Sequence, residues 1–261
     1  VYNPDFKYWQ GVECAFYAAF YRVATLGSGA GVAAIYYFNE RGVPYSKGTG
    51  LYTIEYMLHK VSIALFAGIF FILNWGYMQK YYSQYDMTLL IGFGVTFVIA
   101  AVLLLFACSK KFHEVLLWIV RKLNRSGKLT EQVKKLEEQC AILEDAAATL
   151  LKRGGLIAGC ILKNLLKFTF WYGIPFLILA ETGKLTLSQG LAVTSLAMML
   201  AAVIPAPAGI GSSEFVLTML LAKIVGTGAA GSVALLYRFA TFVLPFVIGA
   251  VVVVLWRRVH R

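Results

Sequence analysis

The stretch PAPAGIGSSEF, residues 205–215, stands between two apolar runs, AVTSLAMMLAAVI (192–204) and FVLTMLLAKIV (215–225). Prolines end helices and glycines permit sharp turns, so this stretch predicts a break in a helical chain. Both flanking runs are apolar enough to enter a bilayer. Irregular backbone is tolerated at membrane depth only where protein buries it or where it lines a wet cavity. The position of this break relative to the membrane therefore decides both the fold and the site.

Composition indicates an integral membrane protein. The 261 residues are 59% hydrophobic and 14% charged, with a mean hydropathy of +0.71, whereas soluble domains carry about 25% charged residues. Lys and Arg gather in residues 110–153 and in the C-terminal WRRVHR. That placement is typical of the cytoplasmic side of a membrane protein. We therefore expect the chain, with its net charge of +11, to have the membrane as its partner and not a nucleic acid.

The sequence predicts no metal site, cofactor or disulfide framework. Four cysteines are far apart, with no pair at metal-ligand spacing, and the three histidines are isolated. Each cysteine is expected to be a small apolar filler. GxSxG, HExxH and P-loop motifs do not occur, and LGSGAG (26–31) has no strand–helix unit around it that would make it a nucleotide fingerprint. No catalytic residue is predicted, and no signal peptide is recognisable. The cysteines are Cys14, Cys108, Cys140 and Cys160.

Four segments are predicted to cross the membrane. Residues 61–78 and 89–109 have no charged side chain, and each approaches the roughly 20 residues that span a bilayer core. A third crossing is expected at 155–180, with a kink at Pro175. The last is expected at 233–256, ending on the basic side. We place residues 51–109 together as two spanning helices.

Residues 110–153 predict a cytosolic helical hairpin. Apolar residues recur at steps of four and three from 129 to 150, as in a heptad seam, and the NRSGK stretch at 124–128 breaks the chain before it. Glu131 and Lys135 are spaced for an i,i+4 ion pair. The same seam would suit a longer coiled coil with a partner, including a second copy of the chain.

Two further regions, 10–45 and 187–226, are short apolar segments interrupted by glycine-rich stretches. Segments of about 10–14 apolar residues are typical of re-entrant or half helices. We place the basic regions, 110–153 and the C-terminus, on the cytoplasmic side. The two short segments within 10–45 must then enter and leave the membrane from that side, and the two within 187–226 from the outer side. A hairpin and a following helix then occur twice in opposite orientations, the pattern of an inverted repeat with a site at the midplane. The same number of crossings would also allow both segments of each pair to cross the membrane completely.

The breaks predict an anion site between the loops. Ser212 or Ser213 is expected to cap a half helix that begins at about Glu214, and such a helix start attracts anions. Arginine suits phosphate, because its planar fork bonds two oxygens. The predicted substrate-binding residues are Arg22, Gly29, Glu55, Lys60, Pro205, Pro207, Gly209, Gly211, Ser212, Ser213, Glu214 and Arg238.

Two alternatives stay open for the charged residues. Glu214 could pair with Arg238, and Glu55 with Arg22 or Lys60, which would only lock the repeats together. Lys163 and Lys167 share one face of a helix, so they either reach the inner interface or line an internal cavity. Glu40, Arg41 and Glu181 are expected at the interfaces.

The C-terminal half resembles the lysylphosphatidylglycerol synthase transmembrane family, also called the flippase-like domain family. Its signature is approximately Pro-x-Pro-Gly-Gly-x-Gly-x-x-Glu, then an Arg in the final helix and a Pro-x-x-x-Gly step. RVATLGSGAGVAAIYYFNERG (22–42) resembles the family's earlier loop region. Ala208 stands where the signature has its first Gly. The matching residues are Pro205, Pro207, Gly209, Gly211, Glu214, Arg238, Pro245 and Gly249.

The resemblance implies a multi-pass protein of the bacterial inner membrane that moves a lipid such as lysyl-phosphatidylglycerol to the outer leaflet, which protects against cationic antimicrobial peptides. It also implies that one or two N-terminal helices and a soluble aminoacyl-transferase domain are absent here. The first function hypothesis is therefore a lipid translocase. The alternatives are a phosphatidylglycerol lysyltransferase component with a soluble synthase partner, and an ion or small-solute transporter.

Overall fold

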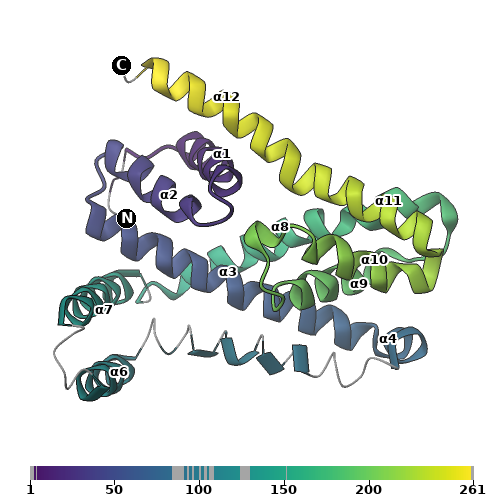
Figure 1. Cartoon of the computed structure of the whole chain (residues 1–261), viewed down its shortest axis with the longest axis horizontal. Coiled ribbons are helices and arrows are strands. Elements are labelled where there is room, and N and C mark those ends of the chain that lie inside the picture. The colour runs from purple at the N-terminus through teal and green to yellow at the C-terminus, as the bar shows by residue number, and fades with distance from the viewer. Residues whose placement is uncertain are drawn as a thin grey trace.

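A computed structural model describes residues 3, 5–83, 91, 92, 94, 95, 97–99, 101, 102, 105, 109–123, 130–150 and 152–259. The regular structure of these residues is helical (Figure 1). Short 3₁₀ turns lie at Ala180–Thr182 and Pro207–Gly209, and a π-helical segment lies at Phe239–Val243. The α-helices are α1 (Tyr8–Ala24), α2 (Gly29–Glu40), α3 (Tyr45–Leu73), α4 (Trp75–Tyr82), α6 (Lys110–Leu123), α7 (Thr130–Leu150), α8 (Gly154–Leu179), α9 (Leu187–Ala201), α10 (Ser212–Val225), α11 (Thr227–Arg238) and α12 (Leu244–Val259).

Three helices in the described part of the chain are long and apolar enough to cross a membrane. They are Tyr45–Leu73, Pro207–Val225 and Thr227–Trp256. The chain is therefore an all-helical membrane protein, as its composition predicts. Helix α8 also has sufficient length, 26 residues or roughly 39 Å, but polar side chains interrupt its middle. The predicted crossing at 89–109 lies partly outside the described residues, so its extent stays a prediction.

The helix that contains the first predicted crossing begins more than four turns before residue 61 and ends inside the predicted range 61–78. Helix α3 begins at Tyr45, directly after Pro44, and ends at Leu73. Its first half is too polar to register as an apolar run, because one face carries side chains that line a cavity. The end is fixed by Asn74, whose side-chain amide donates to the Phe70 carbonyl at 2.8 Å and to Ser188 Oγ at 2.8 Å.

The helix that contains the last predicted crossing also begins before the predicted range 233–256. Only Gly226, with φ of 84°, breaks the helix, and α11 starts at Thr227. The glycine-rich stretch GTGAAG at 226–231 is therefore mostly helical, because the small residues there let α10 and α11 pack closely. Ala230 in this stretch is fully buried. After Arg238 the π-helical segment joins α11 to α12 without a turn.

Each end of the molecule combines elements from both halves of the chain (Figure 1). The α1–α2 hairpin packs through α1 against α12, and α9 of the second hairpin packs against α3. The α1–α12 contact is so close that a side chain at Gly249 would overlap the Phe16 carbonyl. The largest core lies among α9, α10 and α11, where the Tyr82 hydroxyl donates to the Leu220 carbonyl at 3.0 Å.

The predicted hairpin within 110–153 consists of α6 and α7. Their antiparallel arrangement is shown by contacts from the two ends of α6. Arg121 Nη2 lies 2.6 Å from Glu137 Oε1, and His113 Nδ1 lies 3.1 Å from Glu144 Oε1. The predicted i,i+4 ion pair within α7 is present, at 2.7 Å.

The predicted heptad seam of α7 is partly buried. Val133, Cys140 and Leu143 are buried, and α7 uses an adjacent face to pack against α3, where Ala146 lies in a cluster with Ile54. Burial, together with the nearby carboxylates, raises the pKa of the Cys140 thiol. A neutral, enclosed thiol is consistent with the expected role of this cysteine as an apolar filler.

Candidate functional site

The predicted break in the second hairpin is present. Helix α9 ends at Ala201, and α10 begins at Ser212. We call residues 202–211 the second loop. Its backbone turns through the left-handed region at Ala208 (φ 53°), Gly209 (φ 71°) and Gly211 (φ 84°). Glycine adopts these angles at little cost, whereas Ala208 adopts them under strain.

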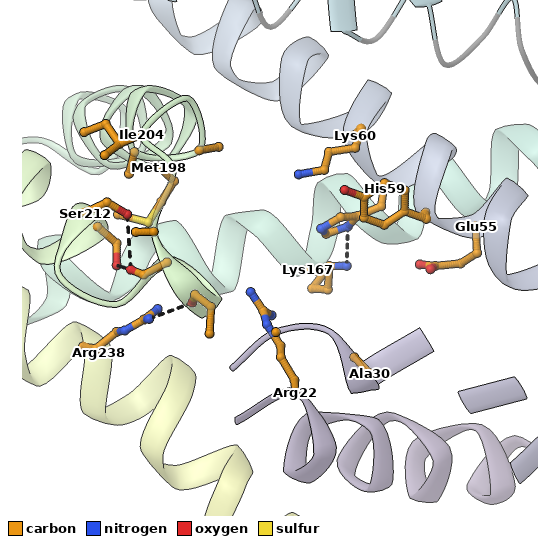
Figure 2. A pocket seen from close by; sticks show the side chains of 18 of the residues that line it. Arg22, Ala30, Glu55, His59, Lys60, Lys167, Met198, Ile204, Ser212 and Arg238 are labelled. Atoms are coloured by element: carbon orange, nitrogen blue, oxygen red, sulfur yellow. Dashed lines mark hydrogen bonds between the residues drawn. The ribbon is translucent and has the colours of Figure 1, made fainter. Parts of the chain in front are cut away.

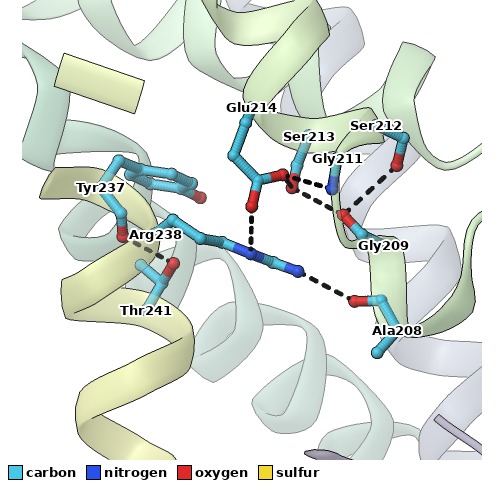
Figure 3. Close-up of polar contacts among 9 residues, drawn as sticks. All are labelled: Ala208, Gly209, Gly211, Ser212, Ser213, Glu214, Tyr237, Arg238 and Thr241. Atoms are coloured by element: carbon cyan, nitrogen blue, oxygen red, sulfur yellow. Dashed lines mark hydrogen bonds and ion pairs between the residues drawn. The ribbon is translucent and has the colours of Figure 1, made fainter. Parts of the chain in front are cut away.

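Glu214 and Arg238 fasten this loop to α11 (Figure 3). The Gly211 N–H donates to Glu214 Oε2 at 3.0 Å, and the Ser213 hydroxyl donates to the same oxygen at 2.8 Å. Arg238 Nε lies 3.0 Å from Glu214 Oε1, and its Nη2 donates to the Ala208 carbonyl at 3.0 Å. The Glu214–Arg238 pairing, one of the two alternatives for these residues, is therefore formed.

The predicted capping serines have a different role. Helix α10 begins at Ser212, before the expected Glu214, and its N-cap is Gly211. The hydroxyls of Ser212 and Ser213 donate to the Gly209 carbonyl, at 3.3 and 2.9 Å. The Glu214 carboxylate serves the helix start instead, so part of the anion site predicted there is occupied by the chain's own side chain.

The first loop, residues 25–28, connects α1 to α2 and is smaller. Its backbone is left-handed at Leu26 (φ 53°) and has φ of 107° at Gly27. The Thr25 hydroxyl donates to the Tyr21 carbonyl and accepts from the Gly29 N–H, both at 2.6 Å. Gly29 thus begins a helix, while its neighbours Gly27 and Ala30 line the cavity described below.

The two loops touch each other at their tips. A Cβ atom placed on Gly27 would lie 3.3 Å from the Ala208 backbone nitrogen. The sequence predicts two glycine-containing breaks that approach each other, and the structure brings them into contact. The sides of the membrane from which they approach stay a prediction.

A cavity of about 580 Å³ lies beside this contact (Figure 2). Both loops, α3, α8 and the Arg238 side chain contribute to its wall. Of the described residues that line it, Glu55 is the only carboxylate, and Figure 2 places it at the opposite end from Arg238. Such a wall suits an anionic group with a cationic group attached to it. The cationic side chains of the wall are Arg22, Lys60, Lys167 and Arg238.

Lys167 lies in the cavity, which decides between its two predicted locations. Its Nζ is 3.1 Å from His59 Nδ1 and donates to Asn164 Oδ1 at 2.9 Å. If His59 Nδ1 accepts this hydrogen bond, its Nε2–H is left as a further donor. Sequence reasoning missed His59, although its spacing of four from Glu55 indicates a common helix face.

A second, apolar hollow of about 240 Å³ adjoins the cavity. Glu55 and Asn164 line it on the side of the polar cavity, and Lys163 lies in its wall. The two lysines of α8 thus face different compartments. We call this hollow the apolar groove; its remaining lining residues are Leu51, Ile54, Leu58, Leu156, Ile157 and Cys160.

The predicted site residues fall into two groups. One group lines the polar cavity, and the other shapes the loops around it. Among the described residues, no ion pair within 4.0 Å joins Glu55 to Arg22 or Lys60, and no group of His, Cys, Asp and Glu could hold a metal ion. The cavity group is Arg22, Glu55, Lys60, Gly209, Ser212, Ser213 and Arg238. The loop group is Gly29, Pro205, Pro207, Gly211 and Glu214.

The family of the chain follows from its sequence match. The family model described as lysylphosphatidylglycerol synthase TM region matches residues 5–249. The chain belongs to that family. The match includes both loops, all of α3 and α8, and Arg238, so it covers the whole cavity wall. No curated protein and no solved structure gives a significant match.

Proposed function

We propose that this chain is a flippase-like lipid translocase. It moves an anionic or aminoacylated phospholipid, such as lysyl-phosphatidylglycerol, between the leaflets of a bacterial inner membrane. The observation that carries the proposal is the polar cavity beside two touching loops, with four cationic side chains and one carboxylate in its described wall.

The headgroup phosphate binds to Arg22, at the end of the cavity whose wall Arg238 holds. A guanidinium fork matches two phosphate oxygens. Glu55, at the other end, accepts the ammonium group of an aminoacyl headgroup. One cavity thereby serves a phosphate and the amine attached to it, which explains why a cationic site retains one carboxylate.

The apolar groove favours a lipid over an ion or a small polar solute. It adjoins the polar cavity at Glu55, so a headgroup in the cavity has a hydrocarbon surface beside it. Burial of acyl chain there contributes about 0.8 kcal/mol per CH₂ group. A transporter of small polar solutes has no use for such a surface.

The packing of the hairpins supports an inverted repeat. The first helix of each hairpin contacts the long helix of the other half, α1 with α12 and α9 with α3. A two-fold operation that exchanges the halves would convert one contact into the other. In such repeats, access alternates as one unit rocks against the other around a midplane site.

Transport assays in proteoliposomes test the proposal. Fluorescent phosphatidylglycerol and its lysyl ester are reconstituted with wild type, with Arg22→Gln and with Glu55→Gln. Arg22→Gln should slow the movement of both lipids, and Glu55→Gln should slow the lysyl ester more than phosphatidylglycerol. Lys184→Gln, an exposed cation outside the cavity, is the matched control. Equal rates in all four proteins would refute the assignment of the cavity.

A lysyltransferase component is the second candidate, because the family description contains the word synthase. The purified chain would be incubated with phosphatidylglycerol and lysyl-transfer RNA, with and without a soluble synthase. Lysyl-lipid formed by the chain alone would favour the enzyme over the translocase. Substrate-dependent current without lipid movement would instead favour an ion or small-solute transporter.

A further inference from the structure

Helix α6 has two different faces. One face packs against α7, with His113 buried and Arg121 paired to Glu137. The other face exposes three large apolar side chains at helical spacing, Val115, Trp118 and Ile119, which are 55%, 60% and 41% exposed. We call these three residues the apolar patch of α6.

Cations surround the apolar patch. Lys111 and Lys122 are exposed on the same side of the helix, near its two ends. Lys122 Nζ lies 4.8 Å from the centroid of the Trp118 ring. Helix α6 also contains Lys110 and Arg121, against a single carboxylate in Glu114. The helix therefore combines an apolar stripe with excess positive charge, as helices that lie on anionic bilayers do.

The position of α6 matches a membrane surface. Helix α7 holds the hairpin against the first turns of α3, where Lys47 pairs with Asp145 and Ala146 packs beside Gly50. Figure 1 shows α3 lengthwise and α6 nearly end-on, so α6 crosses the direction of a spanning helix at its N-terminal end. A helix in that orientation runs along the bilayer surface.

We propose that α6 lies in the interface of an anionic lipid leaflet. Val115, Trp118 and Ile119 enter the boundary between headgroups and acyl chains, where tryptophan is enriched. Lys111 and Lys122 bind lipid phosphates at the two ends of the patch. The α6–α7 hairpin is thereby a peripheral anchor, and this assignment is independent of what the cavity transports.

Fluorescence quenching in nanodiscs tests the proposal. The full chain is reconstituted in phosphatidylglycerol-rich nanodiscs with and without brominated acyl chains, which quench tryptophans that lie among them. The difference between wild type and Trp118→Phe isolates the Trp118 signal. It should be blue-shifted and should lose most of its intensity with brominated lipid. The matched control is Trp118→Phe/Glu138→Trp, whose tryptophan lies at an exposed position of α7, outside the patch, and should stay unquenched.

Charge reversal tests the role of the lysines. Lys111→Glu/Lys122→Glu should reduce Trp118 quenching in anionic nanodiscs. Lys134→Glu/Lys152→Glu, the same charge change at exposed positions elsewhere, should leave it unchanged. Red-shifted, unquenched emission from Trp118 would overturn the proposal. So would blue-shifted emission that is insensitive to brominated lipid and accompanied by cross-linked dimers, since a second copy would then cover the patch.

Discussion

The two loops that meet at the cavity are built alike but fastened differently. Both turn through left-handed backbone, and they touch at Gly27 and Ala208. The second loop is tied to α11 through Glu214 and Arg238. The hydrogen bonds of Thr25 and Ser28 in the first loop stay within its own hairpin.

This difference separates the roles of the two arginines. The Arg238 side chain is only 16% exposed, and two of its nitrogens are engaged by Glu214 and Ala208. Arg22 is exposed. We infer that Arg238 mainly holds a fixed wall of the cavity, while Arg22 extends into the cavity from the first hairpin (Figure 2).

The largest expected effect is that of Arg238→Ala, which would release the second loop. The half-buried Glu214 carboxylate would lose its cation, and breaking such a pair costs about 3–5 kcal/mol of unfolding free energy. Thermal or denaturant unfolding in detergent measures this loss. Arg238→Met/Glu214→Gln, which removes both charges, should be less destabilised than the single variant. An unchanged midpoint for Arg238→Ala would show that the loop is not fastened there.

Gly27→Ala should have the next largest effect on the unfolding free energy, because it changes a residue at which the two loops touch. A side chain at φ of 107° costs about 1–3 kcal/mol, and the new Cβ would push Ala208 away. Gly11→Ala is the matched control, since nothing lies within 4 Å of its added Cβ, and it should stabilise α1 slightly. If both variants unfold at the same midpoint, the loop contact is not tight.

Ala208→Gly should have a smaller effect of opposite sign. Left-handed backbone costs a non-glycine residue roughly 1–2 kcal/mol, which the substitution relieves. Glycine also raises the conformational entropy of the unfolded chain, which offsets part of this stabilisation. We expect a stabilisation of about 1 kcal/mol, measured by the same unfolding assay. Leu26→Gly, also at φ of 53°, tests whether the first loop stores equal strain. Destabilisation by both changes would show that the backbone is not strained at Ala208 or Leu26.

Arg22→Gln should have the smallest effect on stability. An exposed side chain of this kind changes the unfolding free energy by within about 0.5 kcal/mol. Its effect on lipid movement should be far larger than its effect on the unfolding midpoint, in contrast to Arg238→Ala. A large loss of stability would place Arg22 in the fixed framework and remove the distinction between the loops.

The features that could be predicted from the sequence are those with local signals. Pro205, Pro207 and the glycines indicate the second break, and uninterrupted apolar runs indicate helices at membrane depth. The α6–α7 hairpin follows from its heptad spacing. Arg22 and Arg238 could be placed at one site because the order and direction of the predicted crossings bring the two breaks together.

The remaining features depend on contacts that no local pattern specifies. The first half of α3 is polar because it faces a cavity, so hydropathy alone missed its start and His59. Serine is a common helix cap, but Glu214 sits three residues after Gly211 and takes that role in the folded chain. Continuation of α11 through Gly228 and Gly231 required close packing against α10.

The π-helical segment at Phe239–Val243 has a consequence for the whole last helix. Its hydrogen bonds join residues five apart and not four, so it inserts one extra residue into the helix, and the Thr241 hydroxyl donates to the Tyr237 carbonyl beside it at 2.8 Å. Successive α-helical residues are about 100° apart around the axis. The bulge therefore sets the phase between Arg238 and Gly249, so that one points to the cavity while the other abuts α1. Deleting a single residue there would rotate α12 relative to α11. Either Arg238 would then turn away from the cavity or Gly249 would turn away from α1.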